Sequence, residues 1–350
     1  MKKVLYVGEK LTKVTGGADQ INKRNQELLE TEFEVKYLPM CSEKFDKVFL
    51  GIGNTYISLI RDELEYNYYD YVFISQSLFG RVCKYVKKRY PSVKIFVFFH
   101  NIEVQYAREY CKTCGVKAFP FYLMTKYWEY KSCEYGDYYI TLNSRDSKLL
   151  KNIYGRSPDM EMPTSFSDKY DEQRALIVDS NNEILKIDYL FVGVAFFANT
   201  EAVQWFISNV MPNVEGHLYV VGRGMDKHQF KSLSSRVHIY GFVDDLSDFY
   251  YRARMIVSPI HVGGGMKTKT AEALMYGKTI LGTSEAFEGY EYDKQCMYVC
   301  NTVEEYVNHI RLIKANQSTI NRSARNLFVR YYSNDALKIK FHTFINTING

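Results

Sequence analysis

Short runs rich in Val, Ile, Tyr and Phe alternate with segments of helical periodicity along the whole chain, and this alternation restricts the fold strongly. The runs are KVLYVG, FEVKYLP, YVFIS, KIFVFFH and YYITL in the first half, and DYLFVG, HLYVVG, VHIYGF, MIVSP, KTILGT and MYVC in the second. Strands that are separated by helices form parallel sheets with helices on both faces. The sequence therefore predicts an α/β protein with two Rossmann-like, doubly wound domains that face a cleft, where the carboxyl ends of the strands bind ligands.

The domain boundary is predicted from a loss of periodicity. A chain of 350 residues is long enough for two cores. Residues 157–184 turn polar and lack a strand or helix pattern. The expected domains are therefore residues 1–165 and 166–332, followed by an amphipathic helix over residues 333–350.

The composition is that of a folded protein, with 46% hydrophobic and 24% charged residues. The net charge of +5 arises entirely in residues 1–165, which contain 25 Lys and Arg against 20 Asp and Glu, whereas the remainder has 20 of each. This excess is too small for a nucleic-acid-binding surface. It is compatible with a domain that meets anionic lipid or an anionic acceptor.

The cysteines and the apolar runs indicate the compartment. Seven cysteines are scattered through a chain large enough to fold without disulfides, which is typical of a reduced cytoplasmic protein. Cys111 and Cys114 form a C-x-x-C with Cys133 further along, but a fourth zinc ligand at suitable spacing is missing, so ordinary thiols are preferred. The first apolar run is too short for a signal peptide, and no run approaches the ~20 residues of a membrane span. A cytoplasmic location is expected, at the inner face of the membrane if the protein meets lipid.

The segment HVGGGMKTKTAEALMYGK, residues 261–278, places a glycine turn in front of a short helix. Gly263, Gly264 and Gly265 can adopt backbone angles closed to other residues and expose their N–H groups. The helix N-terminus adds unpaired N–H groups and the positive end of a dipole. The combination favours an anion, most often a phosphate.

The first turns of this helix carry two lysines and a glutamate. Lys267 and Lys269 strengthen the preference for an anion, whereas Glu272, three residues after Lys269 and on nearly the same face, suits the hydroxyl pair of a ribose. The ligand implied is a nucleotide. A glycine-rich turn before a surface helix with solvated Lys and Glu is an equally good interpretation of this segment alone.

Other candidate residues follow predicted strands. Gly16 and Gly17 form a second glycine turn after the first strand, which either contacts a ligand or only requires small residues. His100 ends the run KIFVFFH, where the strand delivers its side chain to the cleft, and a functional role is preferred to a core histidine. Arg223, in VVGRG at another strand end, is either a phosphate contact or a solvated arginine.

Two polar patterns precede predicted helices. Asp244 and Asp245 resemble a metal-binding carboxylate pair, but capping of the following helix explains them better. Asn101 is likewise expected to cap the helix that begins IEVQYAREY.

Residues 116–136, VKAFPFYLMTKYWEYKSCEYG, are aromatic and basic together. The stretch suits a membrane surface or an aromatic-lined acceptor site. A helix packed on the N-terminal sheet, with lysines extended along it, is the preferred alternative.

Several segments resemble, in order and spacing, the retaining, nucleotide-sugar-dependent glycosyltransferases of family 4, the group 1 type, which have the two-Rossmann GT-B fold. The resemblance is clearest over residues 189–290, through FVGVAFFANTEAVQWFISNVMP, LYVVGRG and VHIYGFVDDLSDFYYRARMIVSPIHVGGGMKTKTAEALMYGKTILGTSEAFEGY. The first half matches more loosely, through the Gly16–Gly17 turn and the HN at 100 and 101. The resemblance implies a hexosyltransferase of polysaccharide biosynthesis, moving sugar from a nucleotide-diphosphate donor to a glycan or lipid-linked acceptor.

Taken residue by residue, the resemblance places the donor on the C-terminal domain. The backbone of the glycine turn meets the diphosphate or sugar, Lys269 lies near the diphosphate, and Glu272 holds the ribose hydroxyls. On the acceptor-side N-terminal domain, Gly17 lies with Gly16 near the diphosphate, and His100 lies near the donor sugar. The C-terminal helix crosses back onto that domain. The donor-binding residues of the C-terminal domain are Arg223, Gly263, Gly264, Gly265, Met266, Lys267, Lys269 and Glu272, with Phe242 and Val243 along the base.

Two departures from the family's pattern affect the site. The family often has two glutamates eight positions apart, and the first of these positions is Gly264 here. The basic pair that often follows the first strand of the C-terminal domain is missing from FVGVAFFANTEAV. Sugar recognition is then expected from backbone groups or the N-terminal domain, and positive charge at the diphosphate from Lys269, Lys267 or Arg223.

The expected mechanism is transfer with retention by same-face attack, in which fixed N–H dipoles and a lysine stabilise the leaving diphosphate and His100 orients the sugar. It requires neither a cofactor nor a metal.

One alternative is a GT-B epimerase acting on the nucleotide sugar, which would need more carboxylates and histidines than His100 alone. Another is a non-catalytic GT-B partner protein, which the retained Lys269 and Glu272 oppose. A nicotinamide dehydrogenase is disfavoured because YVGEKLTKVTGG lacks the compact G-x-G-x-x-G turn.

Overall fold

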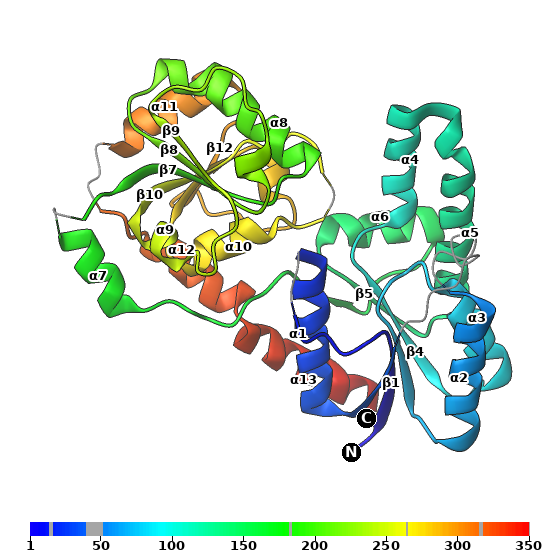
Figure 1. The fold of residues 1–350 in the computed structure, drawn as a ribbon. Coiled ribbons are helices and arrows are strands. Elements are labelled where there is room, and N and C mark those ends of the chain that lie inside the picture. Colours follow the sequence, from blue (N-terminus) through cyan, green and yellow to red (C-terminus); the bar gives the residue numbers. More distant parts are fainter. Residues whose placement is uncertain (14–16, 40–51, 182–183, 264, 315–317, 350) are drawn as a thin grey trace. The chain divides into compact units, whose positions relative to one another are not determined.

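The computed structural model describes residues 1–13, 17–39, 52–181, 184–263, 265–314 and 318–349, and the chain divides into two compact units (Figure 1). Unit 1 comprises Met1–Pro163 with Lys338–Gly350, and unit 2 comprises Thr164–Leu337. Each unit is built on one parallel sheet with helices packed on it.

The sheet of unit 1 has six parallel strands in the order β2-β1-β3-β4-β5-β6. The strands are β1 (Lys3–Val7), β2 (Glu34–Leu38), β3 (Tyr71–Ile74), β4 (Lys94–Phe99), β5 (Tyr138–Thr141) and β6 (Met160–Glu161). The helices are α1 (Gly17–Glu32), α2 (Asn54–Tyr66), α3 (Gly80–Arg89), α4 (Glu103–Cys114), η2 (Gly115–Ala118), α5 (Phe119–Tyr135), α6 (Ser144–Tyr154) and α13 (Asn334–Asn349). Because β1 has β2 on one side and β3 on the other, the strand order reverses there. Doubly wound sheets bind ligands at the carboxyl edge beside such a reversal.

Successive side chains of the central strands point to opposite faces of this sheet, and the two faces differ in composition. One face carries aliphatic residues such as Val72 and Val97, which join a buried cluster with residues of α2 and α3. The other face carries rings, and Phe98 lies 6.3 Å from Phe73. His100 continues this face two residues after Phe98, with the two rings 5.0 Å apart. The period of two therefore fixes the side of the sheet on which His100 lies.

Helix α13 packs with unit 1 from Lys338 onward. The ring of Phe344 meets Phe96 edge-on at 6.3 Å. Near the end of the helix, Asn349 Oδ1 accepts hydrogen bonds from Lys2 Nζ at 2.6 Å and from the Tyr71 hydroxyl at 2.5 Å. The last helix of the chain is thus part of the core of the first unit.

The sheet of unit 2 also has six parallel strands, in the order β12-β11-β10-β7-β8-β9. The strands are β7 (Ile187–Val192), β8 (Leu218–Val221), β9 (Val237–Tyr240), β10 (Ala253–Ser258), β11 (Thr279–Gly282) and β12 (Met297–Val299). The helices are α7 (Glu172–Ser180), α8 (Phe197–Trp205), η3 (Phe206–Val210), η4 (Met211–Asn213), η5 (Met225–Lys227), α9 (Ser247–Arg252), α10 (Thr268–Met275), η6 (Ser284–Phe287), α11 (Val303–Lys314), α12 (Arg322–Leu327) and η7 (Phe328–Tyr332). Since β7 lies between β10 and β8, the order reverses at β7.

Every run that was predicted as a strand forms one, and both sheets are parallel as expected. The structure adds β6 and α7 inside residues 157–184, where no element was predicted. A strand of two residues is too short to show periodicity. Helix α7 has a local start signal instead, because the Asp171 carboxylate accepts from the backbone N–H of Arg174 at 3.0 Å. Among the described helices, none has both the length and the apolar character needed to cross a membrane.

Candidate functional site

The glycine turn lies between β10 and α10, beside the point where the strand order of unit 2 reverses. Gly265 has a φ of 62°, in the left-handed region that favours glycine. Gly263 stands before it in the turn, and Gly264 lies outside the described residues. Met266 follows with only 6% of its surface exposed. The backbone of the turn therefore continues directly into the start of α10.

The side chain and the carbonyl of Lys267 stabilise the conformation of this turn. Its Nζ donates to the Gly265 carbonyl at 2.9 Å and to the Glu285 carboxylate at 2.7 Å. Its own carbonyl accepts from the Tyr290 hydroxyl at 2.8 Å. The side chains of Lys267 and Glu285 are only 11% and 21% exposed, so this ion pair is shielded from water.

Lys269 is a buried cation in the first turn of α10. Its Nζ donates to Asn199 Oδ1 at 2.7 Å and lies 4.1 Å from the centre of the Phe191 ring. Gly193 leaves room for it, because a Cβ there would lie 2.9 Å from Nζ. Burial, with the nearby charge of Lys267, lowers the pKa of Lys269 to about 7. An anion beside this ammonium group would raise that pKa again.

Glu272 lies on the same face of α10 as Lys269. Its carboxylate accepts from the Tyr250 hydroxyl at 3.3 Å, and the Tyr250 ring stacks on Tyr276 with 4.8 Å between centres. Burial raises the pKa of Glu272 to about 7, although Tyr250, Lys169 and Lys269 act in the opposite direction. The site thus holds a buried amine and a half-buried carboxyl, each with a pKa of about 7.

Arg223 and Phe242 meet at the ends of β8 and β9. The guanidinium carbon of Arg223 lies 5.6 Å from the centre of the Phe242 ring. Phe242 is 64% exposed, and the next residue, Val243, is half-buried. A solvent-exposed aromatic ring beside an arginine offers a flat surface on which a planar base can stack.

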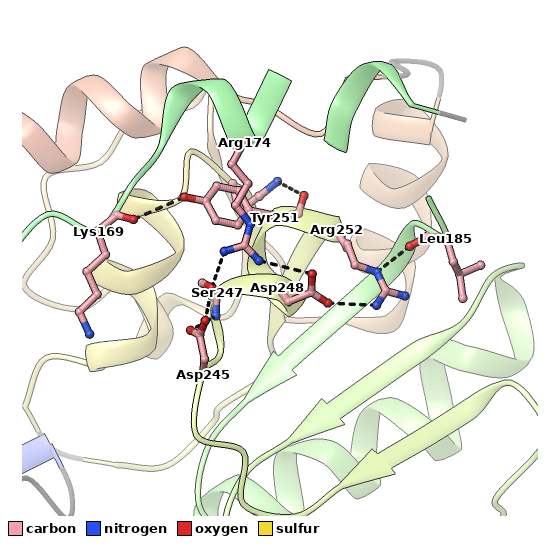
Figure 2. A network of polar contacts seen from close by, with 9 residues as sticks. Lys169, Arg174, Leu185, Asp245, Ser247, Asp248, Tyr251 and Arg252 are labelled. Atoms are coloured by element: carbon pink, nitrogen blue, oxygen red, sulfur yellow. Dashed lines mark hydrogen bonds and ion pairs between the residues drawn. The ribbon is translucent and has the colours of Figure 1, made fainter. Parts of the chain in front are cut away.

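A polar network anchors the loop after Val243 to α9 and α7 (Figure 2). The Asp245 carboxylate accepts from the backbone N–H of Ser247 at 2.8 Å and from its hydroxyl at 2.6 Å, and these bonds lower the pKa of Asp245. Arg174 of α7 donates to the Ser247 hydroxyl at 3.0 Å and lies 3.5 Å from Asp248. Asp245 therefore accepts from the first amide of α9, one position before the N-cap residue Leu246, so the capping prediction is supported for Asp245 and stays a prediction for Asp244.

Three residues at this site were missed by sequence reasoning. They are Asn199, which holds Lys269, Tyr250, which holds Glu272, and the exposed Lys169. The charge of Lys169 lowers the pKa of both Glu272 and Asp245, so its ammonium group lies near both carboxylates. Lys169 and Tyr250 precede Glu272 by many residues, and no local spacing relates them to it.

In unit 1, His100 follows β4 and meets α1. Its Nε2 lies 2.9 Å from Asn22 Oδ1, and a second hydrogen bond joins the ring to the backbone of Ser75. Burial, with the positive charge of Arg24, lowers the pKa of His100 to about 4. The imidazole is therefore neutral at physiological pH. Gly17 is the exposed first residue of the same helix α1, and Gly16 lies outside the described residues.

Asn101 does not cap α4, and that prediction was wrong. The first amides of the helix, those of Glu103 and Val104, donate to the fully buried Glu129 of α5 at 2.8 and 2.9 Å. The amide oxygen of Asn101 is buried without a hydrogen-bond partner. The capping carboxylate comes from a residue 26 positions away, which no local pattern could indicate.

Within the described ranges, no group of three His, Cys, Asp or Glu side chains is arranged to hold a metal ion. Cys111 and Cys133 are free thiols, and the side chain of Cys114 is outside the described part of the chain.

The two parallel six-stranded sheets flanked by helices define a GT-B glycosyltransferase fold. The chain resembles HepE of Anabaena, solved in complex with UDP, with a TM-score of 0.70 at 12% identity over 99% of this chain and 100% of that one. A glycosyltransferase from Rickettsia africae gives 0.66 at 13% identity over 98% of both chains. WaaG, a glycosyltransferase involved in lipopolysaccharide biosynthesis, gives 0.64 at 13% identity over 94% of this chain and 95% of its own.

Residues 186–316 match the family described as glycosyl transferases group 1. No curated protein matches the sequence significantly. This part of the chain, within unit 2, therefore has the sequence of a group 1 glycosyltransferase, a class of enzyme that uses nucleotide sugars. The resemblance, the fold and the class of enzyme inferred from the sequence are confirmed.

Proposed function

We propose that this protein transfers a sugar from a uridine-diphosphate donor to a glycan or lipid-linked acceptor, with retention at the anomeric carbon and without a metal ion. The observation that carries the proposal is the pair of Lys269, which is buried, and Glu272, which is half-buried, on α10 directly behind the glycine turn. HepE, which has the same fold, was solved with UDP and with UDP-glucose, and this supports uridine as the base.

The donor lies along the carboxyl edge of the unit 2 sheet in this proposal. The N–H groups of Gly263, Gly265 and Met266 and the start of α10 face the diphosphate, with Lys269 as the cation. Glu272 accepts hydrogen bonds from the ribose hydroxyls. The base stacks on Phe242.

Arg223 and Lys169 add positive charge on either side of the donor. Lys267 contributes indirectly, since its bond to Glu285 maintains the turn.

Breaking the bond between the anomeric carbon and the diphosphate oxygen builds negative charge on the leaving group and positive charge on the sugar ring. Fixed N–H dipoles and the Lys269 ammonium group stabilise the leaving group without reorganisation. The acceptor hydroxyl attacks from the same face, and the departing phosphate takes its proton. A neutral His100 can orient the sugar without opposing the positive charge on the ring.

Glu272→Ala is expected to weaken UDP binding by at least ~1.5 kcal/mol, the scale of a hydrogen bond to a charged group. Glu272→Gln, which keeps an acceptor oxygen, should lose less. Titration calorimetry measures both, with Glu201→Ala as the control because Glu201 is an exposed carboxylate of the same unit. Unchanged affinity in Glu272→Ala would remove this residue from the site.

The identity of the donor is tested by a thermal-shift series with UDP-, GDP-, ADP- and CMP-sugars, since a bound ligand raises the melting temperature by mass action. A UDP-sugar is expected to give the largest shift. The best UDP-sugar is then incubated with candidate acceptors. A larger shift with another base would contradict uridine, and binding without transfer to any acceptor would favour the non-catalytic partner protein.

Transfer is expected to proceed at full rate in excess EDTA, because the proposed leaving-group stabilisation uses N–H groups and Lys269, and because Asp245 caps α9. The rate is compared before and after chelation. Activity that disappears with EDTA and returns with Mg²⁺ or Mn²⁺ would overturn the metal-free mechanism.

A further inference from the structure

The loop between β7 and α8 is fastened to two residues that are proposed to face the donor. The backbone N–H of Ala195 donates to the Arg223 carbonyl at 2.9 Å. Asn199, in the first turn of α8, accepts from Lys269 Nζ at 2.7 Å and donates to the Val194 carbonyl at 2.9 Å. The loop therefore joins the end of β8 to the buried cation of α10.

Glycines allow this loop to lie against its neighbour. A Cβ at Gly222 would lie 1.9 Å from the carbonyl oxygen of Gly193, and a Cβ at Gly224 would lie 3.1 Å from the Cβ of Ala195. The loops that follow β7 and β8 can approach this closely only because the residues at the contact are small. The course of the β7–α8 loop is thus determined by its own sequence and by that of its neighbour.

The loop ends in an exposed apolar cluster. Phe196 and Phe197 are 49% and 52% exposed, and their rings meet edge-on with 4.4 Å between centres. Val194, before them, is 45% exposed. The buried residues of α8 are Ala198, Thr200, Ala202 and Val203. The core side of the helix is therefore formed without the two rings, which lie at the carboxyl edge of the sheet.

This loop also lacks charge. Residues 193–200 read GVAFFANT, and the basic pair that family members often have here is missing. Aromatic rings cannot replace a lysine or arginine as ligands of phosphate oxygens. They can bind the C–H groups on the face of a pyranose, because that contact removes apolar surface of both partners from water.

We infer that Phe196 and Phe197 bind the sugar of the donor, and that this sugar is an uncharged pyranose. The inference rests on the proposed function, which places the diphosphate at Lys269. Because the sugar is joined to the outer phosphate through a single oxygen, its ring lies next to the groups that bind this phosphate. Asn199 fixes the aromatic pair at that place, since it holds Lys269 and follows Phe197 by two residues.

The rings also define which sugars are excluded. A uronic acid would bring its carboxylate against two phenyl rings that offer it no hydrogen bond, so part of its hydration would be lost without replacement. A neutral hexose, or one with an acetamido group, has no such cost.

Titration calorimetry with UDP, UDP-glucose, UDP-N-acetylglucosamine and UDP-glucuronic acid tests the inference. Phe196→Ala combined with Phe197→Ala should lower the affinity for the tighter-binding neutral UDP-sugar about 10-fold, because two stacking faces are lost. The affinity for UDP should stay within about twofold, since the residues proposed to hold the nucleotide are unchanged. UDP-glucuronic acid is expected to bind at least ~10-fold more weakly than that neutral UDP-sugar.

Two control variants separate this contact from a general effect on unit 2. Phe196→Tyr combined with Phe197→Tyr keeps both rings and should keep the affinity for the UDP-sugar. Leu176→Ala combined with Ile177→Ala removes an adjacent pair of α7 that is 53% and 61% exposed, and should leave both affinities unchanged. Melting temperatures show that each variant is folded.

Saturation-transfer NMR shows directly which protons of the bound UDP-sugar contact the protein. The sugar-ring protons should receive saturation in the wild-type protein and lose it in the double alanine variant, while the uracil and ribose protons keep theirs. This measurement does not depend on transfer, so it needs no acceptor.

The outcomes distinguish this inference from the proposed function. An equal loss of affinity for UDP and for the UDP-sugar would assign the rings to the nucleotide and overturn the inference. An unchanged affinity for the UDP-sugar would also overturn it, even if transfer slowed, because the rings would then meet another surface. Tight binding of UDP-glucuronic acid would overturn the uncharged class. A wild-type protein that does not bind UDP would contradict the proposed function, and the inference with it.

Discussion

His100→Ala is expected to lower the rate of transfer at least ~100-fold, the loss typical of one well-placed polar group in a transition state. The affinity for UDP should stay within about twofold, because the residues proposed to hold the nucleotide are all in unit 2 and His100 is in unit 1. Calorimetry with UDP and steady-state kinetics with the donor sugar measure the two effects. A variant that transfers sugar at the normal rate would make His100 a packing residue.

Asn22→Ala supplies the control for this substitution. It removes the hydrogen bond at 2.9 Å that orients the His100 ring but leaves the imidazole in place, so a smaller loss of rate is expected. Since the pKa of His100 is lowered to about 4, the ring is neutral above about pH 5, and its titration should contribute no change in rate between pH 5 and pH 8. Preserved melting temperatures show that both variants are folded.

Lys269→Met is expected to lower the rate by ~10²- to 10³-fold and also to weaken donor binding, because this amine is proposed to face the diphosphate in both the ground state and the transition state. The free protein has a pKa of about 7 at Lys269, and the anionic donor raises it. Binding above pH 7 therefore takes up a proton. Below pH 7 Lys269 is protonated and contributes fully to donor affinity. Above pH 7 its deprotonation lowers that affinity by at most tenfold per pH unit.

Glu272 should cause donor affinity to fall on the acidic side of pH 7. Its pKa of about 7 is lowered when ribose hydroxyls donate to the carboxylate, so binding favours the ionised form. Affinity for the donor should thus be greatest near pH 7, and Lys269→Met should remove only the fall on the alkaline side. A UDP-sugar is used for this titration because a terminal phosphate would itself titrate near pH 6. An unchanged alkaline limb in the variant would exclude Lys269 as its origin.

Lys278→Met is a closely matched control. Lys278 is also buried in unit 2, with a pKa lowered to about 7 by burial, but its Nζ donates to the carbonyls of Tyr251 and Thr319 at 3.1 and 2.8 Å. It lies just before β11, at the amino edge of the sheet. Loss of this lysine should therefore leave the pH dependence of donor affinity as it is in the wild-type protein.

The features that could be predicted from the sequence are those with a local cause. Strand runs recur because a buried parallel strand needs consecutive apolar residues, and the spacing of Lys269 and Glu272 places them on one face of a helix whatever surrounds it. The glycine turn at Gly265 follows from a backbone angle that other residues rarely adopt. The fold and the class of enzyme depend on such local signals.

The tertiary structure decided the properties that come from distant neighbours. Burial, and not the identity of the residues, brings the pKa values of Lys269 and Glu272 to about 7. Glu129 replaces Asn101 as the cap of α4 because chain folding carries it there from the next helix. The exposed rings of α5 could not be predicted either, since residues 116–136 have an aromatic and basic composition in any orientation, and the contacts of α5 with α3 and α4 determine which side is buried.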